Sequence, residues 1–233
     1  MPPKPSARAG STGSGTASAS VIAEAPQGCA LCPRLAEFRA ANSMLHPNFH
    51  NAPVSSFGDP AARVLVVGLA PGLKGANRTG RPFTGDYAGD LLYATLSAFG
   101  LSRGNFAARP DDGLELTDCM VTNAVRCVPP ENKPTPAEIN LCRQFLSARI
   151  AALPNLSVIV ALGRIAHDSV VVAAGAKRSA FPFAHGAEHA LTNGKRLFDS
   201  YHCSRYNTNT GVLTPEMFRA VFARVRAFLD RPR

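Results

Sequence analysis

The chain has 233 residues, of which 45% are hydrophobic and 18% are charged, and this length and composition suit one globular domain with a short appendage. The 25 basic and 16 acidic residues give a formal net charge of +9, which favours a polyanionic partner, with nucleic acid ahead of an anionic membrane surface. No run of 18 apolar residues is present and no secretory signal is recognisable, so we expect a cytoplasmic protein that does not enter a membrane.

The first 24 residues are predicted to form a disordered basic tail, because they are rich in proline, alanine, serine and glycine and show no periodicity. Residues 25–233 are predicted to form a single domain. Four apolar segments of this domain read as strands: residues 64–70, 118–125, 157–162 and 196–201. Helices are predicted between and after them, at residues 87–99, 135–152, 163–174 and 214–229.

Apolar strands that alternate with helices indicate a parallel sheet covered on both faces. The predicted fold class is therefore α/β, with a three-layer α/β/α arrangement around a central, mainly parallel four-stranded sheet. In such folds ligands bind at the carboxyl ends of the strands, so the segments that follow the four predicted strands are the places to look for a site.

Four of the six cysteines are candidate metal ligands: Cys29, Cys32, Cys127 and Cys142. In a reducing compartment cysteines serve more often as metal ligands or buried thiols than as disulfides. Four thiolates accept either zinc or a four-iron cluster, and the wide spacing of the second pair favours the cluster over zinc. The alternative is a set of four buried free cysteines. Cys119 lies inside a predicted strand and is assigned to the core.

The glycine-rich stretch "GLAPGLKGANRTGRPFTGD", residues 68–86, directly follows the first predicted strand. It matches neither the phosphate-binding P-loop nor the dinucleotide-binding glycine pattern. The turn from Ala70 to Gly72 is expected to present backbone N–H groups to a ligand. Phe83 is the one aromatic residue of the stretch, and it is interpreted either as a platform that stacks on a planar heterocycle or as a core residue that pins the loop.

Two further strand ends carry polar residues. Asn123 lies at the carboxyl end of the second predicted strand, and its amide can donate and accept hydrogen bonds at once, as recognition of a pyrimidine edge requires. His202 follows the fourth and could donate to charge that develops on a leaving group. The other histidines considered, His46, His50, His167 and His185, are expected to be satisfied surface residues.

One zinc-protease pattern occurs by coincidence. "HGAEH", residues 185–189, formally fits H-x-x-E-H, but that pattern needs a helix and Gly186 favours a loop. The order of motifs that a zinc-dependent nucleotide deaminase requires is absent.

Three motifs, in order, resemble those of the uracil-DNA glycosylase superfamily, specifically its iron–sulfur family 5 (type b): "GLAPG…NRTGRPFTGD", "TNAVRCVPPENKPTP…C" and "HCSRYNTNTG". The resemblance spans Cys29 to about Thr214. It implies excision of uracil from DNA at the start of base excision repair. It also implies a structural 4Fe–4S cluster on the four candidate cysteines.

The resemblance further implies roles for individual residues. A base flipped out of the helix would stack on Phe83 and be read by Asn123, and His202 would stabilise the departing base. Backbone N–H groups near Ala70 and Gly72 would share the charge on the base, with Ser204 and Arg205 among the substrate contacts. Many superfamily members have proline or another apolar residue where this chain has Cys203.

Family 4 enzymes carry an acidic residue near the start of the first motif, and this chain has none there. Asn77 and Asp86 are then the polar candidates within the loop. Asn77 could orient a water, and Asp86 could also stabilise a sugar cation, or else it only caps the helix predicted from Tyr87. A site that relies on leaving-group stabilisation should also accept other deaminated bases, such as hypoxanthine.

The expected partner is uracil-containing DNA, double-stranded and also single-stranded, bound by a monomer associated with the nucleoid. The alternative is a DNA-binding protein of the same fold that keeps the iron–sulfur cluster but does not catalyse.

Overall fold

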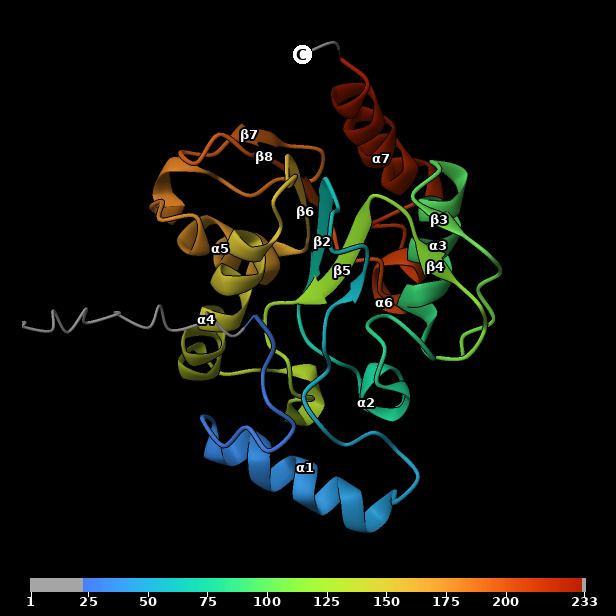
Figure 1. Ribbon diagram of the computed structural model, residues 1–233, viewed down its shortest axis with the longest axis vertical. Helices are drawn as coiled ribbons and strands as arrows, with labels where there is room; N and C mark the ends of the chain where they lie inside the picture. The colour runs from blue at the N-terminus through green and yellow to red at the C-terminus, as the bar shows by residue number, and fades with distance from the viewer. Residues whose placement is uncertain (1–22, 232–233) are drawn as a thin grey trace, which may run out of the picture.

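A six-stranded sheet forms the middle of the computed structural model, which describes residues 23–231 (Figure 1). Its strand order is β1-β5-β2-β6-β8-β7. The four central strands are parallel: β5 (Cys119–Asn123), β2 (Val64–Gly68), β6 (Val158–Leu162) and β8 (Arg196–Ser200). They confirm the predicted parallel sheet.

The sheet is wider than the predicted four strands, because a short antiparallel strand lies along each edge. These edge strands are β1 (Phe57–Gly58) and β7 (Glu188–Ala190). Strands of two or three residues carry no alternating pattern, so the sequence did not indicate them.

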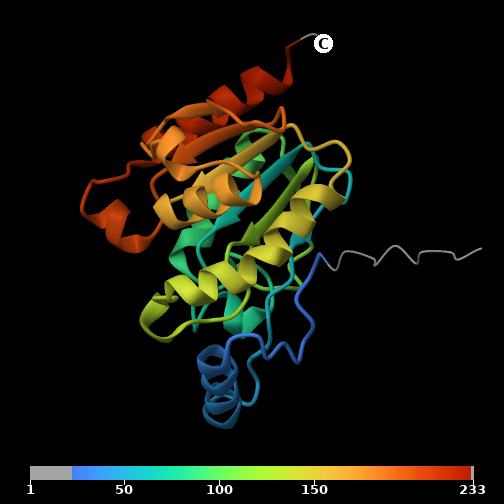
Figure 2. The same cartoon turned by 90° about the vertical axis from the view of Figure 1, so that its left-hand side faces the viewer.

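Helices cover both faces of the sheet, as Figures 1 and 2 show. One face carries α3 (Tyr87–Ala98) and α7 (Pro215–Leu229), and the other carries α4 (Pro136–Ala152) and α5 (Arg164–Ala173). Successive residues of β2 enter the two cores: Val64 and Val66 pack toward the α3 and α7 side, whereas Leu65 and Val67 pack toward the α4 and α5 side. The three-layer α/β/α prediction is confirmed.

Local sequence signals explain where the long helices begin. The Thr135 hydroxyl accepts a hydrogen bond from the Glu138 N–H (3.3 Å), and the Glu138 carboxylate accepts one from the Thr135 N–H (2.7 Å). This capping box starts α4 at the predicted position. At α7 the Thr214 hydroxyl accepts from the Met217 N–H (3.2 Å).

Helix α1 (Pro33–Leu45) was not predicted, nor were several short elements: α2 (Ala76–Thr79), the 3-10 turns η1 (Pro130–Asn132) and η2 (Arg178–Ala180), α6 (Arg205–Asn209), and the small sheet of β3 (Ser102–Arg103) with β4 (Glu115–Leu116). Helix α1 lies apart from the three layers (Figure 1). Its buried residues are Leu35, Arg39 and Asn42, two of which are polar, so α1 shows no apolar stripe.

One residue of the predicted tail, Glu24, belongs to the folded domain. Residues 1–22 lie outside the described part of the chain, but Glu24 is bound to the domain. Its carboxylate accepts from Arg149 (2.5 Å) and from the Ser56 N–H (3.1 Å), and it forms an ion pair with Arg126 (3.2 Å). The folded part therefore includes Glu24. Within residues 23–231, no helix is both long enough and apolar enough to cross a bilayer.

Candidate active site

An open cleft of about 850 Å³ brings together loops that follow the strands at their carboxyl ends. The glycine-rich loop after β2, the start of α3, the turn η1 and the segment after β8 all line it. Six of the predicted site residues face this cleft: Ala70, Gly72, Asp86, His202, Ser204 and Arg205. Phe83 and Asn123 do not line it and are buried at the strand ends, 5% and 3% exposed.

His202 is placed by the short helix α6. The Ser204 hydroxyl caps α6 by accepting from the Asn207 N–H (3.3 Å), and the Asn207 amide donates to the His202 carbonyl (2.8 Å). Burial lowers the pKa of His202 to about 4. The imidazole is therefore neutral at pH 7, with one N–H available to donate to negative charge in the cleft.

Phe83 and Asn123 meet at the end of β2 because Gly68 has no side chain. A Cβ atom on Gly68 would lie 2.4 Å from Phe83 Cζ and 2.5 Å from Asn123 Oδ1. The Phe83 ring also stacks on the His202 ring, with 5.9 Å between the centroids. Within residues 23–231 the Asn123 amide forms no hydrogen bond, so its donor and its acceptor are both available to a ligand.

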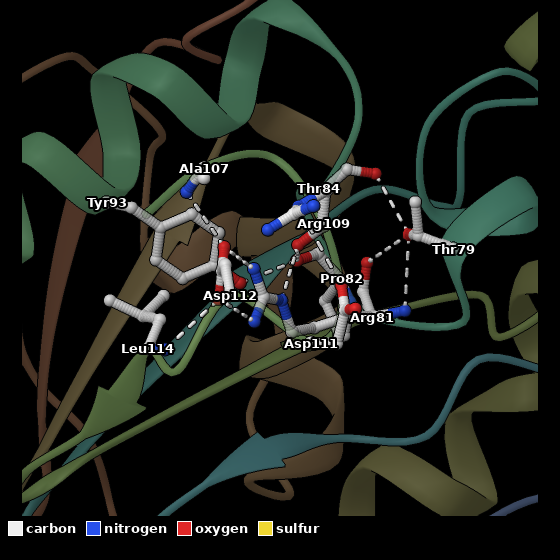
Figure 3. A network of polar contacts seen from close by, with 10 residues as sticks. All are labelled: Thr79, Arg81, Pro82, Thr84, Tyr93, Ala107, Arg109, Asp111, Asp112 and Leu114. Atoms are coloured by element: carbon white, nitrogen blue, oxygen red, sulfur yellow. Dashed lines mark hydrogen bonds and ion pairs between the residues drawn. The ribbon is translucent and has the colours of Figure 1, made fainter. Parts of the chain in front are cut away.

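A buried polar network holds the loop that carries Phe83 (Figure 3). The Arg81 guanidinium donates to both carboxylate oxygens of Asp112 (2.8 and 2.7 Å) and to the Thr84 hydroxyl (2.8 Å). The Tyr93 hydroxyl donates to the Pro82 carbonyl (2.6 Å). Arg81 holds the pKa of Asp112 well below its usual range. Arg81 thus braces the loop and is not free to contact a phosphate.

This bracing fixes an unfavourable backbone conformation. Phe83 has φ of +52°, in the left-handed region that side chains other than glycine rarely adopt. The contacts on either side of it, at Pro82 and Thr84, hold the ring beside Asn123 and His202. Such strain is retained where the surrounding structure over-determines it, often at functional sites.

Asp86 stands at the first position before α3, yet its side chain forms no capping hydrogen bond. Its Oδ1 atom is buried without a hydrogen-bond partner in the described part of the chain. Its Oδ2 atom lies against the loop at Gly72 and Gly75. Burial raises the pKa of Asp86, and the nearby N–H groups of Ala88 and Gly89 oppose this only in part. The carboxylate faces the cleft rather than serving as a helix cap.

Asn77 lies outside the cleft, contrary to the role expected for it. Its side chain is completely buried, and its amide donates to Asn51 Oδ1 (2.9 Å). The Asn51 N–H returns a hydrogen bond to the Asn77 carbonyl (3.2 Å). Asn77 therefore ties α2 to the loop around Asn51, and this geometry does not support a water-orienting role in the cleft.

Three cleft residues with polar side chains were not among the predicted site residues: Lys74, Tyr87 and Asn132. Tyr87 stacks beneath the Arg205 guanidinium, 5.5 Å from the ring centroid. Asn132 has φ of +57°, next to Glu131 at +53°. The signal available in the sequence for Asn132 was the polar loop after Cys127, which contains it.

The four candidate cysteines line one small cavity between the start of α1, the loop after β5 and α4. The Arg126 N–H donates to Cys142 Sγ (3.2 Å). Burial raises the pKa of Cys127 to about 12 and that of Cys142 to about 11. Ala70 of the cleft packs against this same cluster, so the cysteine cavity and the cleft share a wall.

The donor set fits a multinuclear cluster better than a single zinc ion. Thiolates around one tetrahedral zinc lie about 3.8 Å apart, given Zn–S bonds of about 2.3 Å. Among residues 23–231 one group of three or more histidine, cysteine or acidic side chains has its ligand atoms within 4.8 Å of one another, and it contains no cysteine. Two buried cations, Arg39 and Arg126, lie beside the thiols and would balance a negatively charged cluster.

Cys119 is fully buried in β5, as expected for a core residue. The "HGAEH" stretch is not helical, since it runs from a loop into β7, which confirms that the zinc-protease pattern is coincidental. The expectation for His167 was wrong: this histidine is not at the surface but completely buried. The reason lies in its polar partners, which the sequence alone did not reveal.

Comparison with known proteins agrees with this geometry. Residues 55–226 match the family model of the uracil DNA glycosylase superfamily. A type-5 uracil-DNA glycosylase of Thermus thermophilus is 47% identical over 198 residues, covering 83% of this chain and 90% of that protein. The type-5 enzyme of Pyrobaculum aerophilum is 41% identical over 203 residues, 85% of this chain and 88% of that protein. A type-4 enzyme of Thermotoga maritima is 32% identical over 185 residues, 79% and 80% of the two chains. The chain belongs to the uracil DNA glycosylase superfamily, in its type-5 branch.

Proposed function

We propose that this chain excises uracil from DNA by hydrolysis of the N-glycosidic bond and so initiates base excision repair. One observation carries the proposal. The side chains of Phe83 in the loop after β2, Asn123 at the end of β5 and His202 after β8 lie together, beside the cleft that Asp86 lines. An aromatic face, an unused amide and a neutral imidazole are the groups that hold a uracil and receive its charge. The relatives named above carry the same activity in their names.

The base must leave the DNA stack to reach these groups, at a cost of about a few kcal/mol. Phe83 and His202 are already stacked with 5.9 Å between their centroids, too close for a base to lie between the rings. A uracil that stacks on Phe83 must therefore displace the imidazole sideways. This movement brings the imidazole N–H to the edge of the base, where the leaving-group charge develops.

Bond cleavage leaves a sugar cation and a uracil anion. His202 donates its N–H to the anion, and the backbone N–H groups of the turn from Ala70 to Gly72 add to this stabilisation. Asp86 carries the negative charge that suits the sugar cation and the attacking water. Asn123 distinguishes uracil from cytosine by offering both a donor and an acceptor.

The four cysteines are proposed to hold a 4Fe–4S cluster. A bound cluster would cross-link α1, the loop after β5 and α4, and it would take no part in electron transfer. The buried thiols, the N–H donated to Cys142 and the two adjacent arginines support this assignment. Because Ala70 packs against the cysteines, the cluster would also set the position of one cleft wall.

DNA is proposed to approach the cleft along its cationic mouth, where Lys74 and Arg205 are exposed. Ser204 adds a hydroxyl beside them. These groups contact the backbone and not the base, so we propose that the monomer acts on uracil in both double-stranded and single-stranded DNA.

Replacement of Gly75 by alanine tests the position of Asp86. A Cβ atom at Gly75 would lie 2.2 Å from Asp86 Oδ2, so the carboxylate must move. We expect the Gly75→Ala variant to release uracil about 10²-fold more slowly, because a displacement of about 1 Å can cost that much. The measurement is the single-turnover rate of uracil release.

Gly72→Ala is the matched control, since its nearest contact with the same carboxylate is 3.1 Å and can relax. It should retain most of the rate. Equal losses in the two variants would show that the loop backbone, and not the Asp86 position, is what matters.

A substrate series tests the proposal itself. The purified protein is incubated with matched duplexes that contain uracil, hypoxanthine or cytosine, and with the uracil single strand, followed by alkaline cleavage at abasic sites. We expect release of uracil and hypoxanthine but not cytosine. Tight binding of the uracil duplex with no abasic sites, at saturating protein, would instead support the non-catalytic DNA-binding alternative.

A further inference from the structure

A second polar cluster lies in the outer half of the sheet, away from the cleft. His167 of α5, His189 of β7 and Asp199 of β8 place their ligand atoms within 4.8 Å of one another. His167 and Asp199 are completely buried, and His189 is nearly so. No step of the proposed reaction uses these three groups directly.

The hydrogen-bond partners of His167 and His189 indicate where the protons of this cluster lie. His167 Nε2 lies 2.8 Å from the Phe181 carbonyl, which can only accept, so Nε2 carries a proton. His167 Nδ1 lies 2.8 Å from Asp199 Oδ1, and His189 Nε2 lies 3.2 Å from Asp199 Oδ2. An ionised Asp199 that accepts from both rings leaves His167 as an imidazolium that donates at both nitrogens.

A zinc ion would need a free lone pair on His167 Nδ1. The 2.8 Å contact between Nδ1 and the carboxylate is instead a charge-assisted hydrogen bond of normal length. The cluster is therefore a buried ion pair between His167 and Asp199, and His189 is a second hydrogen-bond partner of the carboxylate.

The cluster holds a segment that reaches the catalytic histidine. Residues 181–189 are bound at Phe181 by His167 and at His189 by Asp199. Two backbone bonds join the middle of the segment to β8: the Gly186 N–H donates to the Asp199 carbonyl (2.8 Å) and the Asp199 N–H donates to the Ala187 carbonyl (3.0 Å). Residues 181–189 and the end of β8 thus form one unit.

His185 connects that unit to the site. Its Nδ1 atom accepts from the Tyr201 N–H (3.1 Å), and its ring lies 5.1 Å from the Tyr201 ring. Tyr201 directly precedes His202. The backbone that aims His202 is therefore fixed on one side by α6 and on the other by His185.

We propose that His167, His189 and Asp199 are positioning residues for His202, because they hold residues 181–189 against β8 and His185 fixes the backbone at Tyr201. This inference rests on the role of His202 proposed above. It assigns to this second cluster a part in the reaction although none of its atoms touches the substrate.

The charged groups around His167 are consistent with an imidazolium. Asp199 faces it from β8, His189 from β7, and Asp168 lies next to it on α5, where it pairs with Arg178 of η2 (3.6 Å). Arg164 lies over Phe183, whose ring meets the His167 ring edge-on. Burial lowers the pKa of His167, but the hydrogen bond to Asp199 and its charge outweigh it, so the pKa is raised.

Asp199→Asn is the direct test. Without the carboxylate, His167 becomes neutral, and the charge-assisted hydrogen bond that joins it to residue 199 is replaced by a weaker one between neutral groups. We expect a single-turnover rate of uracil release about tenfold lower, an unchanged Kd for uracil-containing DNA, and faster amide exchange across residues 181–201. The matched control is Asp168→Asn, which removes a neighbouring carboxylate whose ion pair with the exposed Arg178 (3.6 Å) does not involve residues 181–189, and it should leave all three measurements unchanged.

The pH dependence of stability gives an independent test, because a cluster that acted only through apolar packing would contribute equally at every pH. Since the folded pKa of His167 is raised, the stabilisation is present below the unfolded pKa of about 6.5 and is lost as pH rises through the folded value. The difference in Tm between wild type and Asp199→Asn should therefore be larger at pH 6 than at pH 9.

Two further variants separate the possible failures. His185→Ala removes the link while leaving the buried pair, and it should slow uracil release even if Asp199→Asn does not fold. If His202→Ala is slow but His185→Ala and Asp199→Asn are as fast as wild type, the positioning proposal is wrong and the role of His202 stands. If His202→Ala is itself fast, the proposed function of His202 fails first. Binding of zinc by wild type and not by Asp199→Asn would replace the ion pair with a metal site and overturn the proposal.

Discussion

The His202→Ala variant is expected to release uracil about 10²- to 10³-fold more slowly than wild type, with little change in its affinity for uracil-containing duplex. The loss follows from removal of one hydrogen-bond donor aimed at charge that develops only in the transition state. Phe83 keeps its place without His202, because the Arg81 and Asp112 network holds its loop independently. The measurement is the single-turnover rate, with the Kd obtained from binding to the same duplex.

His46→Ala provides the control, since this histidine stacks on Phe49 in the loop after α1 and does not line the cleft. It should match wild type. A His202→Ala variant that excised uracil at the wild-type rate would show that the backbone N–H groups near Ala70 meet the leaving-group charge unaided.

The pH profile distinguishes the two groups in the cleft. Burial lowers the pKa of His202 to about 4 and raises that of Asp86 above its usual value. The reactive form, neutral His202 with ionised Asp86, is therefore lost on acidification. In His202→Ala the fall in rate that remains at low pH should belong to Asp86 alone, so it should disappear in the double variant with Asp86→Asn.

The central fold was predictable because β2 and β6 are apolar on both faces and because α4 and α7 have recognisable first residues. Thr135 with Glu138, and Thr214 with Pro215, mark helix starts by chemistry that acts within one turn. Helix α1 was not predictable, because it buries Arg39 and Asn42 and makes contacts with the cysteine region that no periodic pattern encodes.

Some residues of the site were likewise predictable from the sequence, and others were not. His202, Asn123 and the cysteines follow strands or recur in motifs, and the structure brings His202 and Asn123 to the same strand ends, where the Gly68 backbone allows Phe83 and Asn123 to meet. Asn77 and Asp86 were equal candidates in the sequence, since both are polar residues of one loop. Only the fold separates them, by turning Asn77 onto Asn51 and Asp86 toward the cleft.

His167 shows the limit most clearly. A lone histidine in an apolar helix is expected to find a partner at the surface, and its actual partners lie 14 and 32 residues away in the chain. Burial of such a residue depends on long-range pairing with Asp199, which no local pattern reports.

The second large effect is expected from the cysteines. Cys142→Ser should yield a protein without the brown colour and the visible absorption of an iron–sulfur cluster, and with a Tm at least about 10 °C lower, which for a domain of this size corresponds to about 3 kcal/mol. Cys142 is buried in α4 and accepts the Arg126 N–H, so its loss removes negative charge beside two buried arginines: Arg39, and Arg126, which keeps its ion pair with Glu24.

Cys119→Ser is the matched control, because Cys119 is equally buried but sits in the core between the sheet and helices α3 and α7, away from the other four cysteines. It should keep the colour. Uracil release should fall in Cys142→Ser but not in this control, since Ala70 packs against the cysteine region and η1, with Asn132, follows Cys127 directly into the cleft. A colourless wild-type protein with one zinc per chain would contradict the cluster, and the four thiols would then have to draw together to about 3.8 Å from one another around the metal.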